Sequence, residues 1–249
     1  MIYRFPAPLV PGAFIKRENR FSALVQVGKD IYTCHVPNSG RMKELLKPGT
    51  PVMLNASKDA YNNGNRKTPF DLFLVYHYGV WVSVDSRLPN LLLLEMVKRD
   101  LFVRDSPAAG SHLLNREPSY GKGRFDALLD SSQGEKLLVE CKSVTLVDNQ
   151  KALFPDAPTL RGKRHLEELV RAVREGYRAM VAFLVQREDA RCFGPNWAMD
   201  PEFSKALVFA VSQGVAVESY AFGVKAEGIS TPSHLPVQLK DRFSTAKED

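Results

Sequence analysis

Three residues that could perform metal-dependent chemistry on a phosphodiester lie on two neighbouring stretches of strand-forming sequence. Asp126 is part of "GRFDALLD" (123–130), and Glu140 and Lys142 are part of "KLLVECKSVTLV" (136–147). Carboxylates bind Mg²⁺ or Mn²⁺, and such an ion stabilises charge on a phosphate and lowers the pKa of a bound water. A lysine beside the ion can orient that water or neutralise the transition state. The three residues therefore predict hydrolysis of a phosphodiester, with Asp126 and Glu140 as metal ligands.

The two stretches predict a β-hairpin that brings the acids together. Side chains alternate along a strand, so Glu140 and Lys142 share one face. If "SSQGE" (131–135) is the loop, the paired residues are Asp130 with Lys136, Leu128 with Leu138, and Asp126 with Glu140. Opposed carboxylates repel, which a cation would relieve, and the carbonyl of Cys141 could complete its ligand shell. The alternative is a solvated face with a Glu–Lys pair, because alternating charge occurs on any exposed strand.

A basic helix is predicted further along the chain, over "TLRGKRHLEELVRAVREGY" (159–177). Thr159 is a candidate N-cap, and the positive end of the helix dipole favours phosphate. Arg161 and His165 are therefore predicted to contact nucleic acid, and His165 could look toward the metal site. A solvated basic turn is the alternative.

The elements that must position these residues form a mixed α/β domain, assigned to residues 86–249. The expected order is α-β-β-α-β-α-β, which indicates a mixed sheet flanked by helices. Besides the segments above, it comprises "NLLLLEMVKRDLF" (helix), "RAMVAFLVQ" (strand), "DPEFSKALVFAVSQG" (helix) and "VAVESYAFGV" (strand).

Residues 1–85 read differently, as short strands separated by Gly, Pro and Asn turns. About five strands with one short helix, "SGRMKELL" (39–46), fit a closed barrel of the oligonucleotide-binding (OB) type, although another small barrel or sandwich has a similar strand count. Most of its aromatic residues are expected in the core. The residues predicted to contact the nucleic-acid backbone are Arg20, Arg41, Arg66 and Lys67.

Charge supports a polyanionic partner. The chain has 249 residues and a net charge of +6, and residues 1–85 hold 11 Lys and Arg against 6 Asp and Glu. Nucleic acid is the expected partner of such a basic module, while a solubilising surface is the alternative. Three scattered cysteines form neither a disulfide framework nor a zinc spacing, which indicates a reducing cytosol. We expect a cytoplasmic protein with no signal peptide and no membrane span.

Several long motifs resemble those of the sugar fermentation stimulation protein family of bacteria and archaea. The similarity runs in order from Pro11 to about Leu239 and is carried by "HVPNSGRMKELLKPG", "NRKTPFDLFLV", "RFDALL", "VECKSVTL", "FPDAPTLRGKRHLEEL" and "GPNWAMDPEF". The resemblance implies an OB-like domain followed by a restriction-endonuclease-like, PD-(D/E)xK domain. It also implies DNA binding without strong sequence preference and a role in regulating sugar (maltose-type) metabolism.

The nuclease-like motif of this family maps onto Asp126, Glu140 and Lys142. Cys141 stands where the family's pattern has an aliphatic residue, and Glu95 matches an acidic position that helps to hold metal in many nucleases of this fold. A solvated helix carboxylate is the alternative for Glu95. The prediction is a metal-dependent nuclease. The alternatives are a DNA-binding regulator that does no chemistry and a protein that handles RNA, since OB modules also bind RNA.

Overall fold

The computed structural model describes residues 1–57, 68–121, 123–131 and 134–240. The chain forms two compact units: unit 1 comprises Met1–Leu88, Gln186–Asp189 and Phe222–Thr231, and unit 2 comprises Pro89–Val185, Ala190–Ala221 and Pro232–Asp249. The sequence prediction divides the chain once, after residue 85, whereas the structure assigns two later segments to unit 1.

Unit 1 is built around a closed five-stranded barrel, with strands β2 (Val10–Asn19), β3 (Ser22–Val27), β4 (Asp30–His35), β5 (Pro51–Ala56) and β6 (Phe70–His77). The strands are ordered β4-β3-β2-β5-β6, and the barrel closes where Cys34 and His35 of β4 run parallel to Phe70 and Asp71 of β6. A hairpin adds β7 (Val80–Ser83) to β6. Elsewhere in this unit, β1 (Tyr3–Arg4) pairs with the start of β18 (Gly228–Leu235). The predicted OB-like barrel is confirmed.

The barrel interior follows from the alternation of its strands. Phe14, Val25, Cys34 and Leu54 come from four different strands and are buried in one apolar cluster. The short helix predicted over residues 39–46 is wrong. The segment instead makes one hydrogen-bonded turn, in which the amides of Leu45 and Leu46 donate to the carbonyl of Met42.

Unit 2 contains a mixed sheet ordered β17-β15-β12-β11-β8. Its strands are β8 (His112–Arg116), β11 (Ala127–Asp130), β12 (Lys136–Val144), β15 (Arg178–Val185) and β17 (Ala216–Lys225), the last of which continues into unit 1. β12, β15 and β17 are parallel, while β11 runs antiparallel to β12. Smaller ladders join β9 (Ser119–Tyr120) to β10 (Gly123–Arg124), and β13 (Val147–Asp148) to β14 (Lys151–Phe154) and β16 (Cys192–Pro195).

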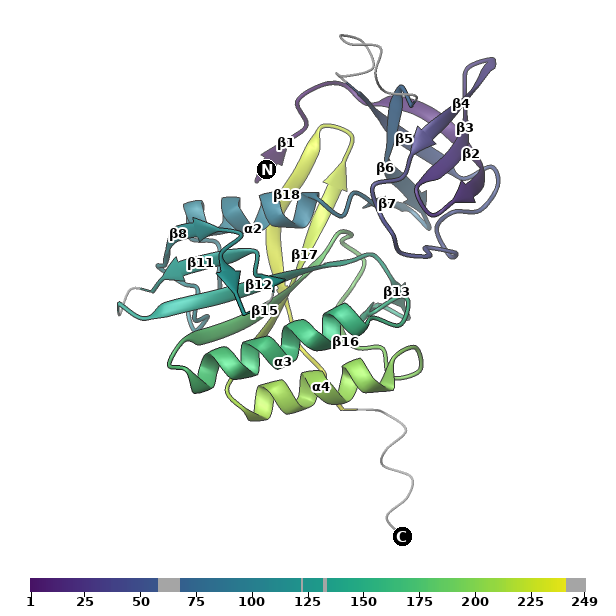
Figure 1. Ribbon diagram of the computed structural model, residues 1–249. Helices are drawn as coiled ribbons and strands as arrows, with labels where there is room; N and C mark the ends of the chain where they lie inside the picture. The colour runs from purple at the N-terminus through teal and green to yellow at the C-terminus, as the bar shows by residue number, and fades with distance from the viewer. Residues whose placement is uncertain (58–67, 122, 132–133, 241–249) are drawn as a thin grey trace. The chain divides into compact units, whose positions relative to one another are not determined.

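Three helices cover this sheet. α3 (Leu160–Arg174) and α4 (Pro201–Ser212) lie side by side on one face, and α2 (Leu88–Arg99) lies on the other (Figure 1). α3 begins where predicted, because Thr159 caps it by accepting a hydrogen bond from the Gly162 amide at 3.0 Å. Its apolar face enters the core through Leu166, Leu169 and Val170. No helix within the described ranges is long and apolar enough to cross a bilayer.

Candidate active site

Asp126 lies at a bend in the chain immediately before β11. The ladder with β12 starts at Ala127 opposite Val139 and has the predicted register, with Leu128 opposite Leu138 and Asp130 opposite Lys136. The ladder does not extend to the predicted pair of Asp126 and Glu140. The Asp126 amide instead donates to the Val139 carbonyl at 3.0 Å. The carboxylate turns toward β12, where Oδ2 accepts a hydrogen bond from the Cys141 amide at 2.7 Å. The hairpin therefore fixes Asp126 at the edge of β12 beside Cys141.

Asn90, at the start of α2, completes the surroundings of this carboxylate. Its Nδ2 donates to Asp126 Oδ1 at 2.7 Å. Asn90 is not among the site residues predicted from the sequence. No sequence signal points to it, because its partner is 36 residues away and is reached only when α2 packs on the sheet.

Glu140 and Lys142 share a face of β12, as the strand alternation predicts. Lys142 Nζ lies 2.5 Å from Glu140 Oε1, and the Glu140 residue is only 4% exposed. A buried carboxylate is stable only when it is paired and hydrogen-bonded. Lys142 therefore acts first as the charge partner of Glu140.

His165 of α3 is the second partner of Glu140. It is 3% exposed, and its Nδ1 bonds the same oxygen, Oε1. Arg161, one helical turn earlier, donates from Nε to His165 Nε2 at 3.3 Å. Since Nε2 accepts that bond, the network assigns the ring proton to Nδ1, which donates to Glu140. The structure thus turns His165 inward onto Glu140, while Arg161 lies on the exposed side of His165.

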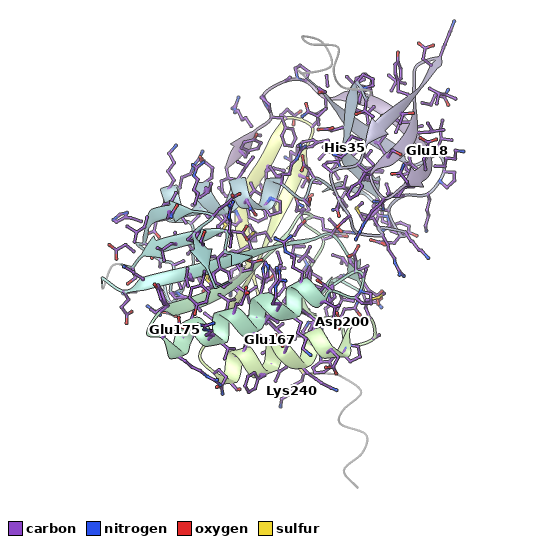
Figure 2. All side chains as sticks on the ribbon, in the orientation of Figure 1. Glu18, His35, Glu167, Glu175, Asp200 and Lys240 are labelled. Carbon is purple, nitrogen blue, oxygen red and sulfur yellow. The ribbon has the colours of Figure 1, made fainter. Side chains whose placement is uncertain are left out.

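The start of α3 is itself fixed to the start of α4. Asp200, labelled in Figure 2, caps α4 through a bond from the Phe203 amide to Oδ1 at 2.9 Å. Its other oxygen, Oδ2, accepts from the Thr159 amide at 2.8 Å. One carboxylate therefore joins both helix N-termini and holds the first turns of α3, including Arg161 and His165, in position.

The two acids of the site have pKa values shifted in opposite directions. Burial raises the pKa of Asp126, and the nearby charge of Glu140 raises it further. Burial also acts to raise the pKa of Glu140, but hydrogen bonding to His165 and the charge of Lys142 outweigh it, so the pKa is lowered. Burial and the two acids raise the pKa of the Cys141 thiol well above its ordinary range, so the thiol stays protonated and is not a nucleophile.

The donor atoms suit a divalent cation. Every hydrogen bond that the Glu140 carboxylate makes with the described residues goes to Oε1, which leaves Oε2 for another partner. The carbonyl of Cys141 points to the same side of β12 as its amide, which is the side of Asp126. Glu140 raises the pKa of half-buried Asp126 by charge repulsion, and a cation relieves such repulsion between carboxylates.

Among the described residues, no third acid is grouped with Asp126 and Glu140. Glu95, the further ligand implied by the family resemblance, is ion-paired with Arg99 at 2.8 Å and with Lys98 at 3.8 Å. Across the described ranges, no three His, Cys, Asp or Glu side chains are grouped so that they could hold a metal ion. The candidate centre therefore has two carboxylates, and the role of Glu95 stays a prediction.

The residues predicted to contact nucleic acid in unit 1 are partly brought together. Arg17 donates to the carbonyl of Arg20 at 2.6 Å and to that of Arg41 at 2.9 Å, and it also bonds the carbonyls of Asn38 and Gly40. The guanidinium of Arg17 thereby holds the backbone of Arg20 close to that of Arg41, and both of these arginines are exposed. Arg66 and Lys67 lie outside the described residues.

Comparisons with known proteins place the chain in a family. The profile described as "SfsA N-terminal OB domain" matches residues 15–84, and the one described as "Sugar fermentation stimulation protein RE domain" matches residues 87–228. A sugar fermentation stimulation protein homolog of Natranaerobius thermophilus is 58% identical over 95% of this chain and 97% of its own length. The homolog of Pyrobaculum arsenaticum is 39% identical over 98% of this chain and 100% of its own.

A solved structure agrees with these matches. SfsA of Pyrococcus furiosus, in complex with Ca²⁺, superposes with a TM-score of 0.85 at 28% identity, over 95% of this chain and 98% of that chain. The match covers the barrel and the mixed sheet, as the predicted fold class requires. The chain belongs to the sugar fermentation stimulation protein family.

Proposed function

We propose that this protein binds DNA without sequence preference and hydrolyses its phosphodiester bonds with Mg²⁺ or Mn²⁺. The observation that carries the proposal is the convergence of half-buried Asp126 and buried Glu140, with Lys142 Nζ 2.5 Å from Glu140 Oε1. Withdrawing two carboxylates from water is unfavourable without compensating cations, and Lys142 supplies a single positive charge. The relative from Pyrococcus furiosus was solved with Ca²⁺, which supports a divalent cation as the second.

The side chains divide the work of such a site. When bound, a divalent cation would stabilise charge on the phosphate and lower the pKa of a bound water. Asp126 and Oε2 of Glu140 would hold it, with the Cys141 carbonyl as a third oxygen. His165 occupies Oε1 of Glu140 and so leaves Oε2 to face the cation.

Lys142 then acts on the substrate. Its ammonium group has three protons. One is donated to Glu140 Oε1, and His165 Nδ1 lies 3.4 Å from Nζ. The remaining donor capacity would orient the attacking water and neutralise the pentacovalent phosphate.

Unit 1 supplies the affinity for the polyanion in this proposal. Residues 1–85 carry most of the net positive charge, and Arg20 and Arg41 are exposed together on the backbone held by Arg17. Contacts of this kind are made to phosphates, so they carry no sequence preference and weaken with salt. RNA offers the same phosphates and is the competing substrate to be tested beside DNA.

Cleavage of supercoiled plasmid and of a labelled single strand in Mg²⁺ or Mn²⁺ tests the proposal. We expect cleavage by the wild-type protein and none in EDTA. Replacing Lys142 by Met keeps the volume and removes the ammonium, so the rate should fall at least about a hundredfold. Lys136→Met is the matched control, because Lys136 is an exposed lysine at the other end of β12. Equal loss in both variants, or cleavage that survives Lys142→Met, would contradict the assignment.

A regulator of sugar-metabolism genes that binds DNA without cleaving it is the second candidate. It is favoured by the absence of a third acid from the centre within the described ranges, and by the names of the relatives. In that case Lys142 serves only to neutralise Glu140, and His165 only to donate a hydrogen bond to it. DNA binding that is the same in EDTA and in Mn²⁺, without cleavage in either, would support the regulator over the nuclease.

A further inference from the structure

The tip of the β6–β7 hairpin in unit 1 holds a tyrosine in an unfavourable backbone conformation. His77 pairs with Val80, so Tyr78 and Gly79 form a two-residue turn. Both have positive φ, +44° at Tyr78 and +92° at Gly79, as a type I′ turn requires. Asn, Asp or Gly normally occupies the first position, because a bulky side chain is strained there. Tyr78 therefore carries a conformational cost that Asn would avoid.

Packing within the protein does not offset this cost. Tyr78 is 86% exposed, so it buries little apolar surface. Its ring touches that of His77, with 4.4 Å between centroids. A residue that is strained while its side chain is exposed to solvent indicates that the side chain binds another molecule.

The surroundings suit nucleic acid. Tyr76, 40% exposed, lies opposite Trp81 on the hairpin, and their rings are in edge contact at 5.2 Å. Arg187 is neutralised by a bidentate pair with Asp189. The tip thus presents an exposed ring beside two further aromatic side chains, in a unit whose first 85 residues carry an excess of Lys and Arg.

We infer that Tyr78 is a stacking platform for an unpaired base of a single-stranded nucleic acid. Bases stack on exposed aromatic rings whatever their sequence, and basic residues follow the backbone. The excess of Lys and Arg in residues 1–85 makes a polyanion a better match than an apolar protein segment. The inference rests on the nucleic-acid binding proposed above, and it adds a site and a preference for single strands.

Tyr78→Asn separates binding from stability, because Asn suits the backbone and lacks the ring. The probe is a fluorescein-labelled oligothymidylate, followed by anisotropy in EDTA so that no metal contributes. We expect the affinity to fall at least about fivefold, since stacking on one aromatic residue contributes about 1–3 kcal/mol. The midpoint of thermal unfolding should stay at or above that of wild type. Tyr78→Phe keeps the ring and should bind like wild type.

Each other result overturns the inference in a distinct way. If Tyr78→Asn binds the oligothymidylate as tightly as wild type, Tyr78 does not stack on a base, and a protein partner would be the occupant of the tip. A fall in both affinity and unfolding midpoint indicates a structural tyrosine. An equal loss of binding to duplex DNA contradicts the preference for an unpaired base. If the wild-type protein binds no oligonucleotide, the proposed function fails as well, which is distinguishable from failure of Tyr78 alone.

Discussion

The candidate active site of unit 2 and the hairpin tip of unit 1 each carry a local free-energy cost, but the costs are of opposite kinds. At Asp126 the cost is electrostatic, because a half-buried carboxylate lies near the charge of Glu140. At Tyr78 it is conformational, because a bulky residue has φ of +44° at an exposed turn. In both places a common replacement, Asn, would remove the cost. Residues retained against stability are candidates for function.

The two regions differ in how the rest of the protein responds. Around Asp126 and Glu140 the chain provides hydrogen-bond partners from three elements, through Asn90, Lys142 and His165. Around Tyr78 it provides a ring contact with His77 and little burial. A buried site must be supported from within before it can act. At an exposed site, contacts with a bound ligand can offset the conformational cost instead.

The largest expected effect is that of Asp126→Asn. This variant tests whether Asp126, like Tyr78, lowers the free energy of unfolding. The change removes one of two carboxylates, so cleavage should fall by about a thousandfold or more if the cation is held there. Asn90 can turn its amide to present oxygen to the new Nδ2. Cleavage rate and unfolding midpoint are to be measured on the same preparations.

The stability of this variant follows from the direction of the pKa shift. The folded-state pKa of Asp126 is raised, so its protonated form favours the fold at acid pH, and that contribution is lost as pH rises through the folded pKa. Above the folded pKa the ionised side chain therefore destabilises the metal-free protein. Asp126→Asn should then unfold at the same temperature as wild type or higher. A clear drop in the midpoint would remove the parallel with Tyr78.

An intermediate effect is expected from His165→Ala. This variant tests how far the hydrogen bonds around Glu140 support the candidate active site, in contrast to the exposed Tyr78. Loss of the ring removes one of the two hydrogen bonds to Oε1 of Glu140, leaving that of Lys142, and breaks the link to Arg161. The affinity for Mn²⁺ should fall about tenfold to a hundredfold, as for other residues that orient a ligand. Calorimetric titration with Mn²⁺ measures this without relying on activity.

Glu167→Ala is the matched control for that variant, because Glu167 lies on the exposed side of α3 (Figure 2). His165→Gln should recover part of the affinity, since the amide of Gln can donate to Glu140. If His165→Ala binds Mn²⁺ as the control does, His165 serves only to fill the core.

The smallest effect is expected from Asn90→Ala, which removes one neutral hydrogen bond to Asp126. Such a bond contributes about 1 kcal/mol, so Mn²⁺ affinity should change only several-fold. The Cys141 amide still holds the other oxygen of Asp126. A loss as large as that of Asp126→Asn would mean that Asn90 positions the carboxylate by itself.

Local pattern was enough to predict the hairpin of the site. Alternation placed Glu140 and Lys142 on one face, and the loop length set the register that pairs Asp130 with Lys136. The cap at Thr159 followed from the preference of helix N-termini for a hydroxyl. These are short-range properties, which neighbouring residues determine.

Features that depend on tertiary packing could not be predicted in the same way. His165 belongs to a basic segment, and only the packing of α3 on the sheet shows that it turns toward Glu140. Residues 39–46 have a helical pattern, but Met42 and Leu45 are drawn into the barrel core as a turn. Tyr78 could not be predicted from the sequence, because its strain arises from a positive φ, which the residue type does not indicate.

Titration of the wild-type protein with Mn²⁺ in a calorimeter, beside Asp126→Asn and Glu140→Gln, tests the central claim most directly. The account predicts one ion per chain in the wild type and at least about a hundredfold weaker binding in each variant, with both variants folded. A wild type that takes up no Mn²⁺, or variants that bind it as tightly as the wild type, would contradict the claim that these two carboxylates form a metal centre.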